Sequence, residues 1–252
     1  PANTDELISM AKSITKGDTY GFVFNQTEPF WLVPWLGGFG GAVFSSDGKT
    51  PTLNTPEMTN TLKFLHDIKY TDKILPKESD GATATTMFKE GKAGMIIDGD
   101  WALADYRKTL GDNFGVAPIP EVSSTSKWPA PYTSGVYFMI PKSLSGDKLQ
   151  AALDFAKYVS SDAVQLDMVK TLSRLPAVTS VLNDPSITGD PILAASAKAM
   201  TYGTAMPPQL EMRCNWDAMK PEMNAVLADQ ETADQAAQKM QAAAESCIQK
   251  QQ

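Results

Sequence analysis

The alternation of short apolar runs with amphipathic helical patterns constrains the fold of this chain most. Apolar runs of strand length lie at residues 20–24, 94–98, 114–120 and 135–140, and glycine or proline bounds most of them. Helical spacing of apolar residues predicts helices over residues 4–16, 55–70, 83–90, 147–160, 161–172, 191–202 and 216–249. Strands that alternate with helices predict an α/β fold with a largely parallel sheet.

Local signals sharpen the predicted boundaries. Thr4, followed by two acidic residues, is predicted as the N-cap of the first helix, and Thr55 before Pro56 as that of the second. An aromatic-rich run at 29–36 leads into the glycine cluster 37–41, which predicts a turn where backbones approach closely. Residues 45–48 are typical of a hairpin turn.

Charge excludes two classes of partner. The chain has 22 Lys and Arg against 29 Asp and Glu, a formal net charge of −7, and no dense basic run. Nucleic-acid binding and attachment to an anionic membrane surface both need clustered positive charge, so neither is expected. No apolar run approaches the roughly 20 residues that span a bilayer.

Catalytic and metal-binding motifs are absent from the sequence. His66 is the single histidine, no G-x-S-x-G turn accompanies it, and it fits a partly exposed helix face. The two cysteines lack metal-ligand spacing, and no phosphate-binding glycine loop follows a strand. We therefore expect no catalytic residue, no metal and no cofactor, although a carboxylate pair for glycoside hydrolysis stays open.

Aromatic residues gather at junctions between elements. Phe30 and Trp31 follow the first strand, Trp101 stands between a strand and a helix, and Trp216 lies near the start of the last helical region. Ligand crevices of open α/β sheets lie at such strand ends. A sugar ring offers an apolar face to an aromatic plane and hydroxyls to carboxylates, so Glu28 and Asp100 beside these aromatics suggest carbohydrate binding. The alternative is that the tryptophans are large core anchors.

Four sequence blocks carry a family resemblance across essentially the whole chain. They are residues 22–31 followed by Gly37 and Gly38, residues 88–95 running into 98–101, residues 114–120, and residues 206–208 followed by Trp216. The chain resembles the family 1 extracellular solute-binding proteins, the maltose-binding-protein-like components that capture sugars for ABC importers. The resemblance implies a periplasmic-binding-protein fold of type II, whose two lobes close around a ligand.

The resemblance also implies the ligand contacts. Glu28 and Phe30 would supply an acid and an aromatic, and Trp101 and Trp216 would stack on sugar rings. Phe30 stands where relatives have a tyrosine, which puts maltose itself in doubt as the ligand. The complete predicted ligand-binding set is Glu28, Phe30, Trp31, Asp100, Trp101, Gly135, Met206, Trp216 and Lys220.

Domain organisation follows from the resemblance as well. Residues 1–133 and 190–252 are expected to form a C-terminal lobe, and 134–189 to belong to an N-terminal lobe that is otherwise missing from this chain. Such a chain is expected to bind sugar weakly or not at all alone. The implied setting is periplasmic or extracellular, with an oligosaccharide ligand, an ABC permease and the complementary lobe as partners.

The cellular location decides what Cys214 and Cys247 are expected to form. In an exported protein they would form a disulfide that holds the C-terminal helix, whereas in a cytosolic protein they would be two buried thiols.

Two other functions compete with sugar capture. One is a glycosidase on an α/β scaffold, which turnover of a glycoside would reveal. The other is an engineered lobe or interaction scaffold without a small ligand, in which substitution of Trp101 or Trp216 would change no binding activity.

Overall fold

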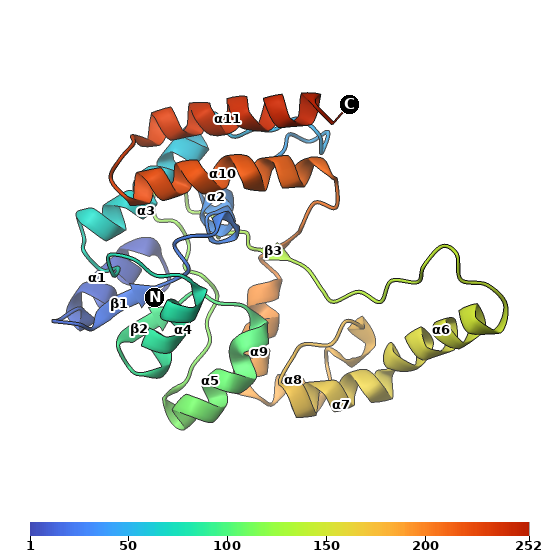
Figure 1. Ribbon diagram of the computed structural model, residues 1–252. Coiled ribbons are helices and arrows are strands. Elements are labelled where there is room, and N and C mark those ends of the chain that lie inside the picture. Colours follow the sequence, from blue (N-terminus) through green and yellow to red (C-terminus); the bar gives the residue numbers. More distant parts are fainter. Residues whose placement is uncertain (252) are drawn as a thin grey trace. The chain divides into compact units, whose positions relative to one another are not determined.

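Two short parallel strands lie at the centre of the first part of the chain. In the computed structural model, which describes residues 1–251, β1 (Tyr20–Val23) pairs with β2 (Ala93–Ile96), and Phe22 lies opposite Met95. Helices α1 (Thr4–Ile14) and α4 (Gly81–Lys89) pack against these strands (Figure 1). Helices on a parallel sheet bury its strands, which explains why residues 22–24 are continuously apolar. The predicted α/β class is confirmed.

The start of α1 corrects one prediction. Asn3, not Thr4, is the N-cap, and its side-chain oxygen accepts a hydrogen bond from the Glu6 N–H at 3.0 Å. Thr4 is the first helical residue, is buried, and donates its hydroxyl to Ser123 Oγ at 3.1 Å. Asparagine caps helices at least as well as threonine, and the contact with Ser123 occupies the Thr4 hydroxyl.

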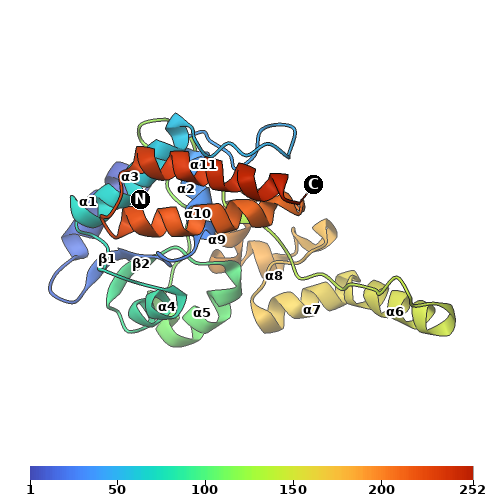
Figure 2. The same cartoon turned by 45° about the horizontal axis from the view of Figure 1, so that its top comes forward.

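Three helices form the other layer of this part of the chain. Helices α3 (Pro56–Tyr70), α10 (Glu211–Leu227) and α11 (Ala233–Gln249) pack against one another, with α10 and α11 side by side in Figures 1 and 2. Thr55 caps α3 as predicted, since its side chain accepts from the Met58 N–H. The core between these helices contains Leu62, Leu65, Ile68, Met219, Met223 and Met240.

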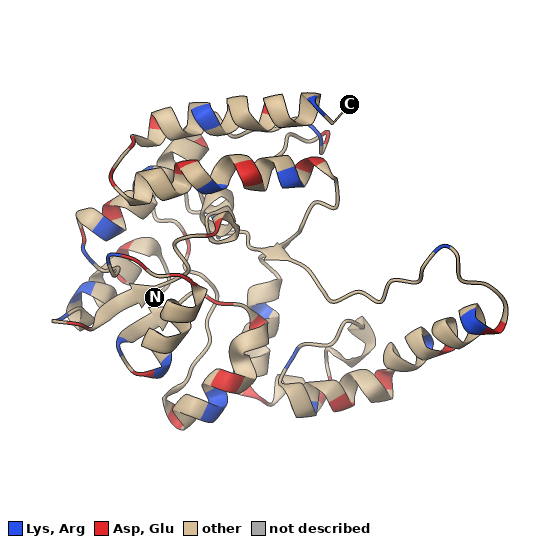
Figure 3. Ribbon diagram, in the orientation of Figure 1, with Lys and Arg blue, Asp and Glu red and all other residues tan. Residues whose placement is uncertain are grey.

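The C-terminal region is two helices rather than one continuous run. The chain turns between Leu227 and Ala233, where Asp229 has a φ of 58°. Thr232 then starts α11 with a capping box, in which its side chain and that of Gln235 each bond the other residue's backbone N–H. Acidic and basic residues are interspersed along α10 (Figure 3). The two helices are joined by a disulfide between Cys214 and Cys247, whose Cα atoms are 5.6 Å apart.

The aromatic-rich segment is more helical than predicted. A 3₁₀ turn, η1 (Pro29–Trp31), leads directly into helix α2 (Val33–Gly38), which includes part of the glycine cluster expected to be a turn. A Cβ on Gly37 would lie 2.6 Å from the Ala130 Cβ, which is a close approach, and the predicted turn follows the helix at Gly40, whose φ is 91°. The predicted turn at 45–48 is present, because the Gly48 N–H donates to the Ser45 carbonyl at 2.9 Å.

Internal contacts divide the described chain into two compact units. The first comprises residues 1–98, 119–133 and 202–251, and the second residues 99–118 and 134–201. The first unit also contains a second parallel pair, β3 (Tyr132–Thr133) with β4 (Thr204–Ala205).

The second unit is mainly helical. A 3₁₀ turn, η2 (Asp100–Ala102), precedes α5 (Leu103–Leu110), and η3 (Gly111–Asn113) follows it. Its other elements are α6 (Gly146–Val159), α7 (Asp162–Leu172), η4 (Thr179–Val181), α8 (Pro185–Thr188) and α9 (Pro191–Met200). A small core joins them through Leu103, Val169, Ile187 and Leu193.

Two predicted strands are wrong. Residues 114–120 form no strand, although Phe114 and Val116 pack against the small core of the second unit. Residues 135–140 also lack a strand, and Val136 and Met139 are 84% and 88% exposed. An apolar run becomes a strand only when another strand bonds its backbone, and among residues 1–251 none pairs with either segment.

Candidate ligand-binding hollow

A hollow in the first unit gathers five of the predicted ligand contacts. Its volume is about 390 Å³, within the range of small-molecule sites. Its walls are Glu28, Pro29, Phe30, Met206, Trp216, Asp217 and Lys220. These residues come from segments nearly two hundred positions apart in the sequence, so only the folded chain brings them together.

Three backbone elements position these side chains. Glu28 and Phe30 lie where the chain leaves β1, and Pro29 at the first position of η1 fixes the backbone between them. Met206 directly follows β4, and its N–H donates to the Thr133 carbonyl at 3.1 Å. Trp216 and Lys220 are four residues apart on α10, so they share one face of that helix.

The aromatic rings of the hollow are held by their neighbours. Trp216 is half-buried, packs against the main core, and lies 6.4 Å from the Phe30 ring centroid with 44° between the planes. Tyr132 meets Trp216 edge to face at 6.0 Å. Burial raises the pKa of Tyr132 to about 12, so its hydroxyl stays neutral throughout the physiological range.

An ion pair supplies the polar side of the hollow. Lys220 Nζ donates to Glu28 Oε1 at 2.5 Å, with the two side chains 49% and 45% exposed. Exposed pairs of this kind add little to stability, so the contact mainly orients the two groups. A carboxylate has several acceptor positions and an ammonium three donors, and both can therefore also bond ligand hydroxyls.

The other predicted contacts lie elsewhere. Trp31 packs against the core and meets Phe30 edge to face at 5.4 Å, but it does not line the hollow. Asp100, Trp101 and Gly135 belong to the second unit. Trp101 is 51% exposed, and its ring lies over Gly99, where an added Cβ would be 2.3 Å from the ring. Gly135 is exposed in the irregular segment 135–140.

Two residues that line the hollow and one that supports it were not predicted from the sequence. Pro29 and Asp217 adjoin predicted contacts in the chain, so their neighbours in sequence could have indicated them. Tyr132 supports Trp216 from β3, and nothing in its local pattern marks that role.

Other features of the described chain add no further chemistry. His66 contacts Asp229 Oδ1 at 2.9 Å on the surface of the first unit, away from the residues that line the hollow. Among residues 1–251, no helix is long and apolar enough to cross a membrane. The same residues contain no cluster of His, Cys, Asp or Glu suited to a metal ion.

The helices packed on short parallel strands are α/β, the class expected of the periplasmic-binding-protein type. The sequence profile described as bacterial extracellular solute-binding protein matches residues 1–195, more than half of the chain. The chain therefore belongs to the bacterial extracellular solute-binding protein family. Its place is outside the cytoplasm, in the periplasm or at the cell surface.

Two similar proteins are named for binding maltotriose or maltodextrin. The chain is 29% identical over 239 residues to a maltotriose-binding protein of Pyrococcus abyssi, covering 93% of this chain and 51% of that protein. It is 27% identical over 209 residues to a maltodextrin-binding protein of Bacillus subtilis, covering 80% of this chain and 49% of the relative. The chain thus spans about half the length of the curated relatives it matches.

Solved structures show the same likeness. A maltose/maltodextrin-binding domain from Bdellovibrio bacteriovorus, bound to maltotriose, superposes with a TM-score of 0.90 and 36% identity. The match covers 99% of this chain and 67% of that chain. These findings agree with the family that the four sequence blocks indicated.

Proposed function

We propose that this chain contributes one wall of the sugar site in the solute-binding component of an ABC importer, with a maltooligosaccharide as ligand. The observation that carries the proposal is the hollow formed by Phe30 and Trp216 beside the Glu28–Lys220 pair. Aromatic faces suit the apolar side of a sugar ring, and the charged pair suits its hydroxyls. The sugars named for the three relatives support this ligand class.

The partners follow from the same proposal. A permease in the membrane would receive the sugar, and a second lobe would complete the site around it. Asp100, Trp101 and Gly135 remain proposed contacts from the second unit. The protein would act by binding and release without chemical change to the sugar.

We also propose the domain division that the resemblance implies, with 1–133 and 190–252 as one lobe and 134–189 as part of another. The exposed apolar side chains of residues 136–139, together with Phe155 and Tyr158 on α6, support it. Contiguous exposed apolar surface commonly marks a protein–protein contact. An N-terminal lobe of the family type would cover these side chains.

The function is tested by saturation-transfer NMR with maltotriose and this chain. We expect saturable binding with a dissociation constant of about 1 mM or weaker, a binding free energy near −4 kcal/mol, because one wall buries only part of the sugar. Trp216→Ala should abolish the transfer. Trp128→Ala is the matched control, because Trp128 is an exposed tryptophan of the same unit that does not line the hollow.

Two results would count against the proposal. Equal saturation transfer to the Trp216→Ala and Trp128→Ala variants would place any binding outside the hollow. Release of glucose or shorter oligosaccharides during the experiment would favour a glycosidase over a transport component.

A further inference from the structure

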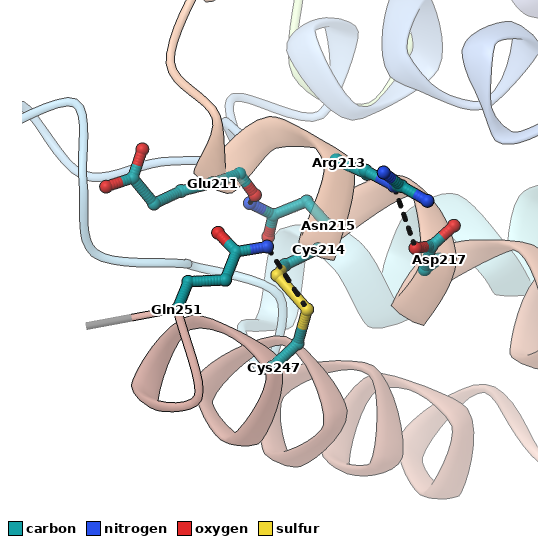
Figure 4. The surroundings of a disulfide bond; sticks show 7 residues. All are labelled: Glu211, Arg213, Cys214, Asn215, Asp217, Cys247 and Gln251. Carbon is teal, nitrogen blue, oxygen red and sulfur yellow. Dashed lines mark hydrogen bonds and ion pairs between the residues drawn. A yellow bond between two sulfur atoms is a disulfide. The ribbon is translucent and has the colours of Figure 1, made fainter.

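We propose that the Cys214–Cys247 disulfide is a positioning element for the binding hollow, which holds Trp216 in its ligand-ready place. The inference rests on the proposed function. Cys214 lies two residues before Trp216 on α10, and Cys247 lies near the end of α11. Figure 4 shows the disulfide joining the first turns of α10 to the neighbouring helix.

The segment of α10 that carries the hollow has a weak N-terminal end. Its N-cap, Leu210, is 83% exposed and provides no side-chain hydrogen bond to the first turn. Capping side chains normally satisfy some of the free N–H groups there, and their absence costs about 1 kcal/mol of helix stability. This end of α10 is therefore held by backbone bonds alone, which the Met212 and Arg213 N–H groups donate to the Gln209 and Leu210 carbonyls at 3.0 and 3.1 Å.

The other end of the same segment is weakened by Pro221. This proline lies inside α10 and has no N–H to donate to the carbonyl of Asp217, the residue next to Trp216. Residues 211–220 are thus bounded by an uncapped end and by an interrupted hydrogen-bond ladder. The residues that contribute to the hollow from α10 all lie between these two points.

A buried amide inside the segment adds to its weakness. Asn215 is fully buried, and its Nδ2 donates to the Glu211 carbonyl at 3.1 Å. Its Oδ1 has no hydrogen-bond partner among the described residues. An unsatisfied buried acceptor is unfavourable and would be relieved if this turn opened toward water.

The disulfide joins this segment covalently to α11 through Cys214. Cys214, which supplies one of the two sulfur atoms and has no exposed surface, lies about half a turn before Trp216 and less than two turns before Lys220. Binding geometry depends on side chains held by their supporting contacts to within about half an ångström. Loss of the tie is therefore expected to weaken sugar binding before it unfolds the helix.

The test compares the native chain with the Cys214→Ala/Cys247→Ala variant in maltotriose titrations, at a temperature where both are folded by circular dichroism. We expect the dissociation constant to rise by about fivefold, the lower end of typical couplings between distinct sites. A second arm uses the native chain treated with a water-soluble phosphine, which is oxidised to its oxide as the disulfide becomes two thiols. The reduced native chain should show the same rise in dissociation constant.

Leu62→Ala is the stability control, since Leu62 is buried in α3 and does not line the hollow. It should lower the melting temperature yet leave the dissociation constant unchanged. An unchanged dissociation constant in the variant and the reduced chain would overturn the proposal, as would complete unfolding on reduction, because the proposed role is local. Absence of binding by the native oxidised chain would instead contradict the proposed function itself.

Discussion

At the scale of single residues, Gly21 on β1 has the least room for a side chain among the glycines of the first unit. A Cβ on Gly21 would be 2.1 Å from the Ala11 carbonyl oxygen and 2.2 Å from its Cα. Both atoms belong to the backbone of a helix, so they cannot turn aside as a side chain could. Glycine at position 21 is what lets α1 lie directly on the strand that leads to the hollow.

We expect Gly21→Ala to lower the free energy of unfolding by 1–3 kcal/mol, roughly the cost of overpacking a filled core. Gly94→Ala, on the paired strand, is the matched control. A Cβ there would meet the tip of the Ile14 side chain at 2.7 Å, which can rotate away. Urea denaturation measures both, and an equal loss in the two variants would show that the backbone contact is not what matters.

At the scale of elements, the start of α9 depends on one carboxylate. Asp190 accepts hydrogen bonds from the N–H groups of Ile192 and Leu193 at 2.9 and 3.1 Å, and from Arg107 at 2.6 Å. Partial burial alone would raise the pKa of Asp190, but the Arg107 and backbone hydrogen bonds outweigh it and hold that pKa below its ordinary value. This residue joins α5 to α9 inside the second unit.

Two variants separate the capping role of Asp190 from the role of its charge. Asp190→Ala should cost about 1 kcal/mol from the lost cap, whereas Asp190→Asn keeps a capping oxygen and should cost less. Because the folded pKa is lowered from 3.8, the charge stabilises fully above that value and the benefit is lost as pH falls through the lower folded pKa. Thermal melts from pH 3 to 7 should therefore show the Asn variant converging on the native chain in acid. A difference that stays constant with pH would contradict this account.

At the scale of the whole molecule, the two units differ in how much core supports them. The first has an extensive core around α3, α10 and α11, whereas the core cluster described in the second contains four buried residues. The side chains of residues 136–139 are exposed, and residues 135–140 have no ladder of backbone hydrogen bonds. Local stability follows buried contacts and paired backbone, so it should be lowest in this segment.

Hydrogen exchange followed by mass spectrometry tests this gradient together with the proposed domain division. Peptides covering 135–140 should exchange fastest and those of α3 slowest. Addition of a separately produced N-terminal lobe of a family member should slow exchange at 135–140, while serum albumin at the same concentration should not. Unchanged exchange with the lobe would count against the proposed division.

Patterns inside short windows of sequence were sufficient for many elements. The 3.6-residue periodicity and the Thr55 cap predicted α3, and the four blocks indicated the family. Failures occurred where the outcome depends on distant partners. Asn3 displaced Thr4 as cap because Thr4 bonds Ser123 across more than a hundred residues, and the 135–140 run lacks the neighbour that would make it a strand.

The binding hollow likewise depends partly on local residue chemistry and partly on contacts between distant residues. Residue chemistry determined the candidates, since aromatic rings beside acids at element junctions suit a sugar wherever they fold. Which of them meet was decided by tertiary structure, which places Glu28 beside Lys220 and Phe30 beside Trp216 while Trp31 packs against the core. The physical reason is that side-chain chemistry is local to a residue, whereas proximity depends on how the whole first unit packs.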